Sequence, residues 1–360
     1  MKKGDFMNRP LYQRIQYDII RRIQSGELAE GDLVPSEKDL SLQYGVSRIT
    51  AKNALNGLVE RGLLSRYRGK GTFVRTSPEA KRRRTFPTGD NKTIAVILPA
   101  MKTKNDQRLL DGLEKYCTKA HYNILVRITR ESQDEEARAI EQFRETGADG
   151  FIIIPVEREN YNDEILRLSL DRIPLVLVSC FLKEIKTYSV SSDNVGGVRE
   201  AVSDLIARGH RRIAYLSPEI TNTATDERAR GYELACMDHG MPIDKTLWCM
   251  LPFETIVQGG GQDEITRFLN EKNVTAVLAV NAELAQYAFQ AIRTLCSGKT
   301  SYPELVAFDD ADLEGIPHIR QQEDEISRLA VALLSEQLHG RFDPRRITVP
   351  IHYKRALEEV

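Results

Sequence analysis

The spacing of apolar residues near the amino end predicts three helices in close succession. Apolar side chains recur every four positions from Leu11 to Ile23, which is the pattern of an amphipathic helix. Ser36 is suited to cap the next helix, and Asp39 occupies the reciprocal position of a capping box. Because Gly45 follows closely, this second helix must be short.

The third predicted helix begins after Ser47 and has two chemically different faces. Its apolar stripe ends at Leu58, whereas Arg48, Lys52 and Asn56 lie four residues apart and share the opposite face. A short helix, a glycine turn and a second helix with exposed Arg, Lys and Asn form the layout of a helix-turn-helix. In that layout the second helix enters the major groove of DNA.

Two short apolar segments after this helix predict a β-hairpin with a basic tip. Residues 63–67 and 72–75 flank the string Arg68-Gly69-Lys70-Gly71. The glycines let the backbone approach a phosphate or the minor groove closely. The tip is not a nucleotide-binding P-loop, because Lys70 is followed by Gly and the glycine spacing is different.

Beyond Thr93 the pattern changes to short apolar runs that alternate with amphipathic helical stretches. The runs span residues 94–98, 124–128, 151–154, 175–178, 213–216, 276–280 and 305–308. Continuous apolar strands joined by helices are typical of a parallel sheet covered on both faces. Because about seven such units are more than we expect in a single sheet, we expect two sequential, doubly wound lobes.

The expected fold class is therefore α/β with an N-terminal winged helix-turn-helix. We expect residues 1–75 to form the DNA-binding head and residues 92–360 to form a body of two lobes. Residues 76–91 lack apolar periodicity and contain two prolines and a Lys-Arg-Arg-Arg run, so we expect a linker there. The basic run either touches phosphate or is simply solvated.

Charge is distributed unevenly along a chain whose net charge is only −1. Residues 1–84 contain 18 Lys and Arg and 9 Asp and Glu. Residues 85–360 contain 33 Lys and Arg and 43 Asp and Glu. A basic head on an acidic body is the arrangement expected if only the head meets a polyanion. Chance clustering is the alternative, and the motifs must decide.

Composition excludes several classes of protein. No stretch approaches the ~18 apolar residues of a membrane span, and no apolar segment follows the basic amino end, so we expect a cytoplasmic protein. The five cysteines and six histidines show no disulfide or metal-ligand spacing, so we expect no metal and no cofactor. No catalytic motif follows a strand. We therefore expect a protein that is not an enzyme, with a sugar kinase or isomerase as the open alternative.

Several motifs of the head follow one another in the order of one regulator family. PLY, G-x-L-x-x-G-D, PSE, GVSR, AL-x-x-L, GLL and GKGTFV occur between Pro10 and Val74, and this segment resembles the GntR-family winged helix. Lys52 departs from the arginine usual in that family and lacks its bidentate fork. The resemblance implies DNA contacts at Lys38, Ser47, Arg48, Thr50, Lys52, Arg68, Gly69 and Lys70.

The body carries strings that resemble the LacI-type sugar-sensing domain. They include SVSSDNVGGVREAVSDLIARGHRRIAYLSP, DERARGYELACMDHGM and VAFDD. That domain is similar to periplasmic binding proteins, so the resemblance implies a two-lobed, periplasmic-binding-protein-like body. A GntR-type head on such a body resembles the arabinose-repressor subgroup. In open α/β sheets, ligands bind beyond the carboxyl ends of the strands. The resemblance implies effector contacts at Asn105, Asp106, Asp193, Arg228, Phe253 and Asn281.

Purely structural roles stay open for some of these residues. Arg228 could form an ion pair, Asp193 could cap the helix that follows it, and Phe253 could belong to the core. The aspartate that grips the effector in the LacI-type family is Ala282 here, next to Glu283. Either the ligand differs or a neighbour supplies the carboxylate.

Together these features predict a repressor of carbohydrate-utilisation genes. We expect a homodimer on a palindromic DNA operator, with no membrane partner. A pentose or hexose such as arabinose would release the DNA, although the sequence leaves the opposite sign open. A transport-binding protein is the rival interpretation of the body, and the basic head argues against it.

Overall fold

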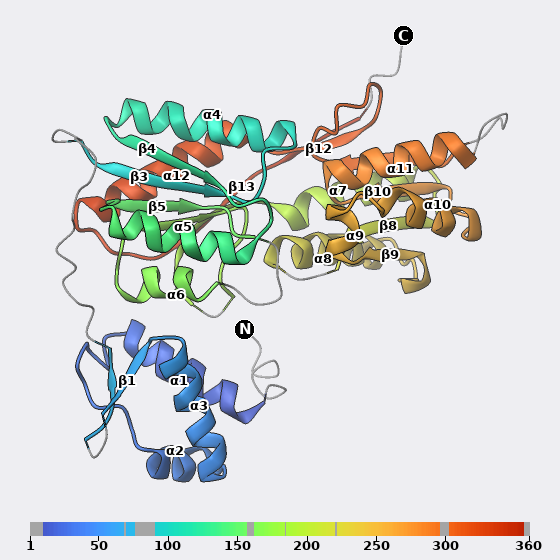
Figure 1. The fold of residues 1–360 in the computed structure, drawn as a ribbon. Coiled ribbons are helices and arrows are strands. Elements are labelled where there is room, and N and C mark those ends of the chain that lie inside the picture. The colour runs from blue at the N-terminus through green and yellow to red at the C-terminus, as the bar shows by residue number, and fades with distance from the viewer. Residues whose placement is uncertain are drawn as a thin grey trace.

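The computed structural model describes residues 10–67, 70–75, 91–156, 162–183, 185–219, 222–295 and 302–355. It contains an N-terminal head and a larger body made of two lobes (Figure 1). Of the predicted linker, only Asn91 is described. Arg68 and Gly69 of the predicted wing tip also lie outside the described residues.

Three helices and a hairpin form the head, as the sequence predicts. They are α1 (Leu11–Gln24), α2 (Glu37–Tyr44), α3 (Arg48–Glu60), β1 (Leu64–Tyr67) and β2 (Gly71–Val74). Ser36 and Asp39 make the predicted capping box of α2, and Gly45 ends that helix with a φ of 63°. The apolar stripes of α1 and α3 face each other around Ile19 and Leu55 and form the core of the head.

The first lobe is a parallel sheet with helices on both faces. It contains β3 (Thr93–Leu98), α4 (Lys104–Lys119), β4 (Asn123–Ile128), α5 (Gln133–Glu145), β5 (Gly150–Ile153), α6 (Asp163–Leu170), β6 (Leu175–Val178), β7 (Tyr188–Ser192), α12 (Glu323–Leu338) and β13 (Arg346–Val349). The strand order is β13-β7-β6-β5-β3-β4. Helices α4 and α12 cover one face, and α5 and α6 cover the other (Figure 1).

The second lobe repeats this architecture with a second sheet. It contains α7 (Asn194–Ala207), β8 (Ile213–Pro218), α8 (Thr223–Asp238), a 3-10 turn at Lys245–Leu247, β9 (Trp248–Leu251), α9 (Phe253–Val257), α10 (Gly261–Glu271), β10 (Ala276–Ala279), α11 (Ala282–Leu295), β11 (Glu304–Phe308), β12 (His318–Arg320) and β14 (His352–Lys354). The order is β14-β12-β11-β10-β8-β9, and only β14 runs antiparallel to its neighbour.

The expectation of two sequential lobes is wrong, because the chain crosses between them three times. It leaves the first lobe after β7, returns from β12 to α12, and leaves again between β13 and β14. Helix α12 returns because its apolar face packs on α4 and on the sheet of the first lobe. The crossings are bonded together: Ser192 Oγ donates to Gln321 Oε1 over 2.5 Å, and Asp193 N donates to Val349 O over 2.9 Å.

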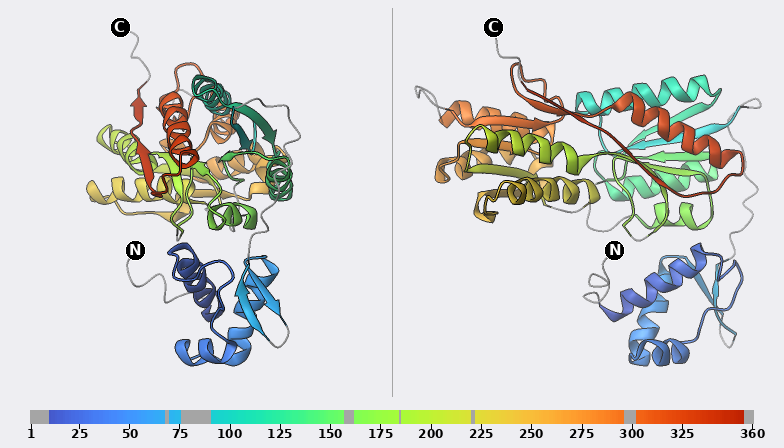
Figure 2. Two further views of the ribbon diagram at one scale, coloured as in Figure 1. Left: turned by 90° about the vertical axis from the view of Figure 1, so that its left-hand side faces the viewer. Right: turned by 180° about the vertical axis from the view of Figure 1, so that it is seen from behind.

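The head lies against the first lobe on the side of α6, and the second lobe extends away from it (Figure 2). Within the described ranges, none of the helices combines the length and the apolar character that a bilayer crossing requires. Cys117, Cys180, Cys236 and Cys249 are buried and form no disulfide with one another.

Candidate functional site

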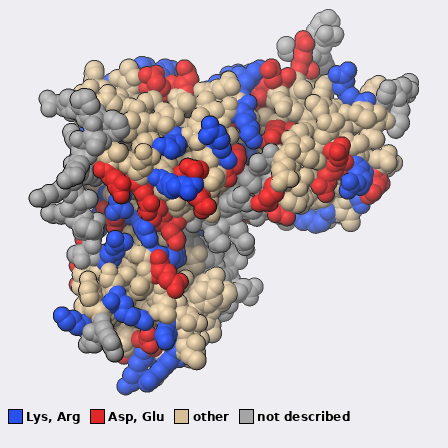
Figure 3. Space-filling view, in the orientation of Figure 1, with Lys and Arg blue, Asp and Glu red and all other residues tan. Residues whose placement is uncertain are grey.

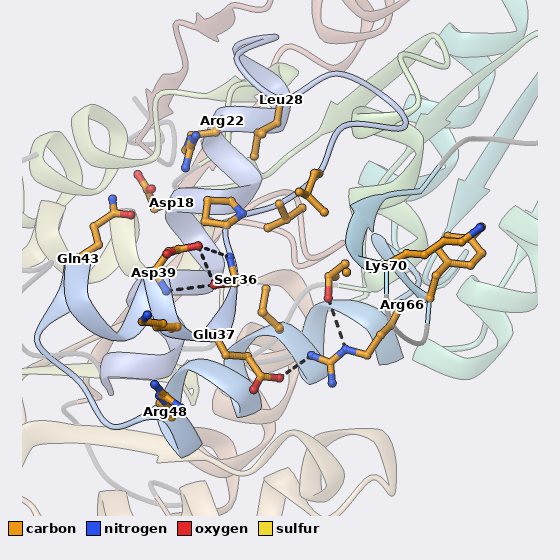
Figure 4. A pocket seen from close by; sticks show the side chains of 18 of the residues that line it. Asp18, Arg22, Leu28, Ser36, Glu37, Asp39, Gln43, Arg48, Arg66 and Lys70 are labelled. Carbon is orange, nitrogen blue, oxygen red and sulfur yellow. Dashed lines mark hydrogen bonds and ion pairs between the residues drawn. The ribbon is translucent and has the colours of Figure 1, made fainter.

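An open groove crosses the head between the wing and the helix-turn-helix (Figure 4). Lys38 at the start of α2, Arg48 at the start of α3 and Lys70 on the wing line it, and all three are exposed. Glu37 of α2 pairs with Arg66 of β1 over 3.0 Å, which ties the wing to the second helix. The fold thus brings three predicted DNA contacts into one basic surface.

The start of α3 explains where the other predicted contacts lie. Ser47 Oγ accepts from Thr50 N over 3.0 Å and lies 2.9 Å from Thr50 Oγ1, so this pair forms the helix cap. A helix start favours nearby anions, because its N–H groups and dipole point outward. Lys52 is exposed one turn further along, whereas Ala51 and Leu55 of the same helix are buried.

Charge on the surface follows the same division. Lys and Arg side chains gather at the end of the head that lies farthest from the body (Figure 3). Where the first lobe meets the head, Asp and Glu are mixed with Lys and Arg. Because opposite charges attract, this distribution favours contact of a polyanion with the far end of the head.

A second cavity, of about 180 Å³, lies between the two lobes. Its walls are the segments that follow β3, β5, β6, β10 and β11, so it sits at the carboxyl ends of the parallel strands. Its polar lining residues are Lys102, Thr103, Asn105, Asp106, Glu131, Ser179, Asn222, Arg228, Asn281, Glu283, Asp309 and Gln321. We call this cavity the interlobe cleft.

Ion pairs tie the lobes together beside the cleft. Lys104 of α4 pairs with Asp312 over 2.5 Å, and Arg108 pairs with Asp310 over 3.2 Å. At α8, Asp226 pairs with Lys183 of the first lobe over 2.8 Å. The structure therefore has its lobes in contact around the cleft.

Two predicted effector contacts lie at the start of α4. Asp106 accepts from the backbone N–H groups of Lys102 and Thr103, so its carboxylate already serves as part of a capping box. The Asn105 Oδ1 is buried and has no hydrogen-bond partner among the described residues. A buried acceptor without a partner is costly, and a ligand hydroxyl would satisfy it.

Arg228 projects from α8 into the cleft. Its Nε donates to Asn194 Oδ1 over 3.0 Å and its Nη1 to Val280 O over 2.6 Å. Its guanidinium carbon lies 3.7 Å from the centroid of the Phe308 ring. These contacts use two of five N–H donors and fix the orientation of the rest. No described ion pair holds Arg228, so the ion-pair alternative has no support there.

Asp309 lines the cleft although it is not among the predicted effector contacts. It follows β11 directly, is 8% exposed and accepts from Gln321 Nε2 over 2.7 Å. Burial raises the pKa of Asp309 to about 6, although the nearby Arg228 guanidinium acts in the opposite direction. The signal was present in the string VAFDD after an apolar run, and Asp309 offers the carboxylate that Ala282 lacks.

The cleft also concentrates unusual backbone conformations. Glu131, Ser179 and Asp309 line it with positive φ values of 62°, 68° and 75°. Side chains other than glycine rarely adopt such angles, and strained residues of this kind cluster at binding sites.

The remaining predicted effector contacts are placed differently. Asn281 lines the cleft, and its Oδ1 accepts from Leu284 N over 2.8 Å. Asp193 is not among the lining residues: it caps α7 by accepting from Gly196 N over 2.8 Å, at the first crossing between the lobes. Phe253 begins α9, and its side chain lies outside what the structure describes.

Known proteins match both parts of the chain. Residues 11–74 match the family model of bacterial regulatory proteins, gntR family. Residues 91–356 match the model of periplasmic binding proteins and the sugar binding domain of the LacI family. The arabinose metabolism transcriptional repressor of Geobacillus stearothermophilus is 26% identical over 344 residues, which cover 92% of each chain.

Solved structures share the fold. The complex of the transcriptional regulator CelR with cellobiose matches with a TM-score of 0.67 and 21% identity, over 89% of this chain and 98% of that one. A LacI family transcriptional regulator from Enterococcus faecium with bound ribose matches with a TM-score of 0.61 and 22% identity. That match covers 73% of this chain and 97% of the regulator. With residues 91–356 matched, this protein belongs to the family of periplasmic binding proteins and LacI-type sugar-binding domains, and a gntR-family head precedes that domain.

Proposed function

We propose that the protein is a transcription repressor that binds a palindromic operator as a homodimer and releases it when a small neutral sugar occupies the interlobe cleft. The proposal rests on one observation: a single chain joins a basic groove on a helix-turn-helix to a polar cleft of small-ligand size. The similar Geobacillus protein is a repressor of arabinose metabolism, which favours a pentose or hexose such as arabinose. The protein acts in the cytoplasm and is not an enzyme.

On the DNA side, α3 enters the major groove, and Arg48 reads guanine through its bidentate fork. Lys38 and Lys70 line the same groove as Arg48 and bind phosphates, and Lys52 contributes charge on the exposed face. Ser47 and Thr50 hold the helix start against the DNA backbone, and Arg68 and Gly69 are the remaining proposed DNA contacts.

On the sugar side, the cleft favours a neutral ligand over a phosphorylated one. Four carboxylates outnumber the two basic side chains, Lys102 and Arg228, among the lining residues. A cleft of about 180 Å³ is also below the roughly 300–1,000 Å³ of pockets for drug-sized ligands. Asn105, Asp309 and Arg228 offer the acceptors and donors that sugar hydroxyls need.

A thermal-shift screen against pentoses, hexoses and their phosphates tests the sugar side. We expect one neutral monosaccharide to stabilise the protein by about 2.7 kcal/mol at 100 times its dissociation constant. Arg228→Met should abolish this shift, whereas Arg230→Met, a change at an exposed residue of α8 outside the lining, should keep it. Stabilisation by sugar phosphates alone, or chemical conversion of the sugar, would contradict the proposal.

Binding to duplexes selected from a random library tests the DNA side. Arg48→Ala should lose preference for the selected sequence, at a cost of about 1–3 kcal/mol. Lys70→Ala should weaken binding to all sequences alike and reduce the salt slope by about 1. Equal loss of sequence preference in both variants would argue against the assigned roles.

A further inference from the structure

The head contacts the first lobe through helix α6. Arg61 Nε pairs with Asp163 Oδ1 over 2.7 Å, although the two residues lie 102 positions apart. Arg167 donates from Nε and Nη2 to the Arg61 carbonyl oxygen over 2.8 and 2.6 Å. Arg61 is the C-cap of the recognition helix α3, so the contact holds the end of that helix.

Apolar packing completes this contact. Leu166 of α6 is 4% exposed and belongs to the hydrophobic cluster of the head, and Leu170 and Ile185 pack beside it. Gly62 follows Arg61 with a φ of 65°, and a Cβ there would lie 2.6 Å from Arg167 Nη2. Glycine thus lets the arginine reach the helix end. A buried leucine and a charged hydrogen-bond network together form a specific interface between the head and the first lobe.

The start of α6 is also bonded to the wall of the interlobe cleft. Asn162 caps α6 by accepting from Glu164 N over 3.0 Å. Its Nδ2 donates to the buried Glu136 carboxylate over 3.2 Å, and the other oxygen of Glu136 accepts from Val156 N over 2.8 Å. Pro155, the residue before Val156, lines the cleft. A short run of hydrogen bonds therefore joins the cleft wall to α6.

We propose that Asp163, Leu166 and Arg167, which we call the α6 seat, transmit sugar binding in the cleft to the recognition helix through Arg61. This inference rests on the proposed function. It identifies the residues of one chain through which sugar binding in the cleft affects DNA binding by the head. Movement of the cleft wall at Pro155 shifts Asn162 through Glu136 and so reorients α6. The head follows because the seat grips the C-cap of α3.

A small rotation at the seat is enough to disturb DNA binding. Helix α3 has 13 residues and is therefore about 20 Å long. With its end held at Arg61, a rotation of about 10° moves Arg48, at the other end, by roughly 3 Å. A shift of that size takes a side chain out of hydrogen-bond range of a base edge.

Operator affinity of the full chain with and without L-arabinose tests this route. The wild type should lose affinity by a factor within the 5–150-fold range of allosteric couplings. In the Asp163→Ala and Arg167→Lys variants, L-arabinose should change operator affinity by no more than about twofold. Calorimetry should show that both variants still bind arabinose as the wild type does. Arg138→Lys on α5, which alters an exposed ion pair with Glu135, is the control and should keep the wild-type factor. Wild-type coupling in both seat variants would overturn the proposal.

Hydrogen exchange of α6 in the full chain, with and without operator, gives a readout that needs no sugar. Operator binding should change exchange across residues 163–170 in the wild type and in the Arg138→Lys control, but not in the seat variants. If arabinose leaves operator affinity unchanged yet this exchange responds, the choice of sugar fails and the seat stands. If α6 exchange is the same with and without operator, the seat is refuted.

Discussion

Asp309 shows how position changes the chemistry of a single carboxyl group. It is buried at the end of β11 with a positive φ, and burial raises its pKa to about 6. The charge is retained near neutral pH because Arg228 lies close and Gln321 donates to the carboxylate. Asp309 is therefore an acceptor at pH 7.5 and becomes a neutral acid on mild acidification.

Sugar binding should consequently weaken as the pH falls through 6. If only the ionised carboxylate accepts the sugar hydroxyl, affinity drops about tenfold between pH 7.5 and pH 5. Asp309→Asn should bind more weakly at neutral pH and show no such dependence, and calorimetric titration of the sugar at each pH measures both. A wild-type affinity that is flat from pH 7.5 to 5 would exclude Asp309 as a ligand.

The raised pKa of Asp309 affects folding stability in the opposite direction from sugar binding as the pH changes. Because the pKa of Asp309 in the folded protein is above its ordinary value of 3.8, the neutral form is favoured in the folded state. Its contribution to stability is full below pH 3.8 and is lost as the pH rises through about 6. Ligand binding and ligand-free stability thus respond to this one group in opposite directions.

At the scale of elements, the sequence predicted the buried strands well and the polar ones poorly. The run at residues 175–178 coincides with β6, because a parallel strand covered on both faces must be continuously apolar. Strand β7 reads Tyr-Ser-Val-Ser-Ser and is wholly buried, but its serines hide it from an apolar pattern. Helix α6 has only eight residues, too few for a clear periodicity.

The candidate site divides in the same way. The capping box of α2 is local, so Ser36 and Asp39 could be predicted from their spacing alone. The contact of Arg61 with Asp163 joins elements far apart in sequence, and no local pattern encodes it. Sequence motifs therefore predicted residues that line the groove and the interlobe cleft, whereas the connection between these two surfaces required the fold.

Close packing of α7 and α8 gives a testable requirement for one glycine. A Cβ at Gly231 would lie 2.6 Å from Val195 O and 2.9 Å from Val198 Cβ. Backbone cannot yield easily, so Gly231→Ala should destabilise the second lobe by about 1–3 kcal/mol. This would occur even though alanine favours helix by about 1 kcal/mol. Thermal and denaturant unfolding measure the change.

Gly260→Ala is the matched control for that substitution. The nearest atom to a Cβ at Gly260 is Thr255 Cγ2 at 3.4 Å, which is ordinary contact, so the change should stay within about 0.5 kcal/mol. Equal unfolding midpoints for the two variants would show that α7 and α8 are not packed as closely as described.

At the scale of the whole molecule, three crossings join the lobes at one place and leave the cleft open to rearrangement. Gln321 lies at the second crossing and forms hydrogen bonds with both Ser192 and Asp309. The three crossings, which we call the hinge, therefore share a residue with the cleft. The ion pairs Lys104–Asp312 and Lys183–Asp226 bridge the lobes outside the hinge. Exposed pairs of this kind contribute little, about 0–1 kcal/mol each, so they permit opening and closing.

Linkage between the two sites tests the account most directly. Calorimetry should measure the dissociation constant of the stabilising monosaccharide for the free protein and for its operator complex. If the sugar weakens operator binding by some factor, thermodynamics requires the operator to weaken sugar binding by the same factor. We predict a sugar dissociation constant 5–150-fold higher in the complex, within the usual range of such couplings. Identical constants with and without operator would contradict the claim that the cleft controls the head.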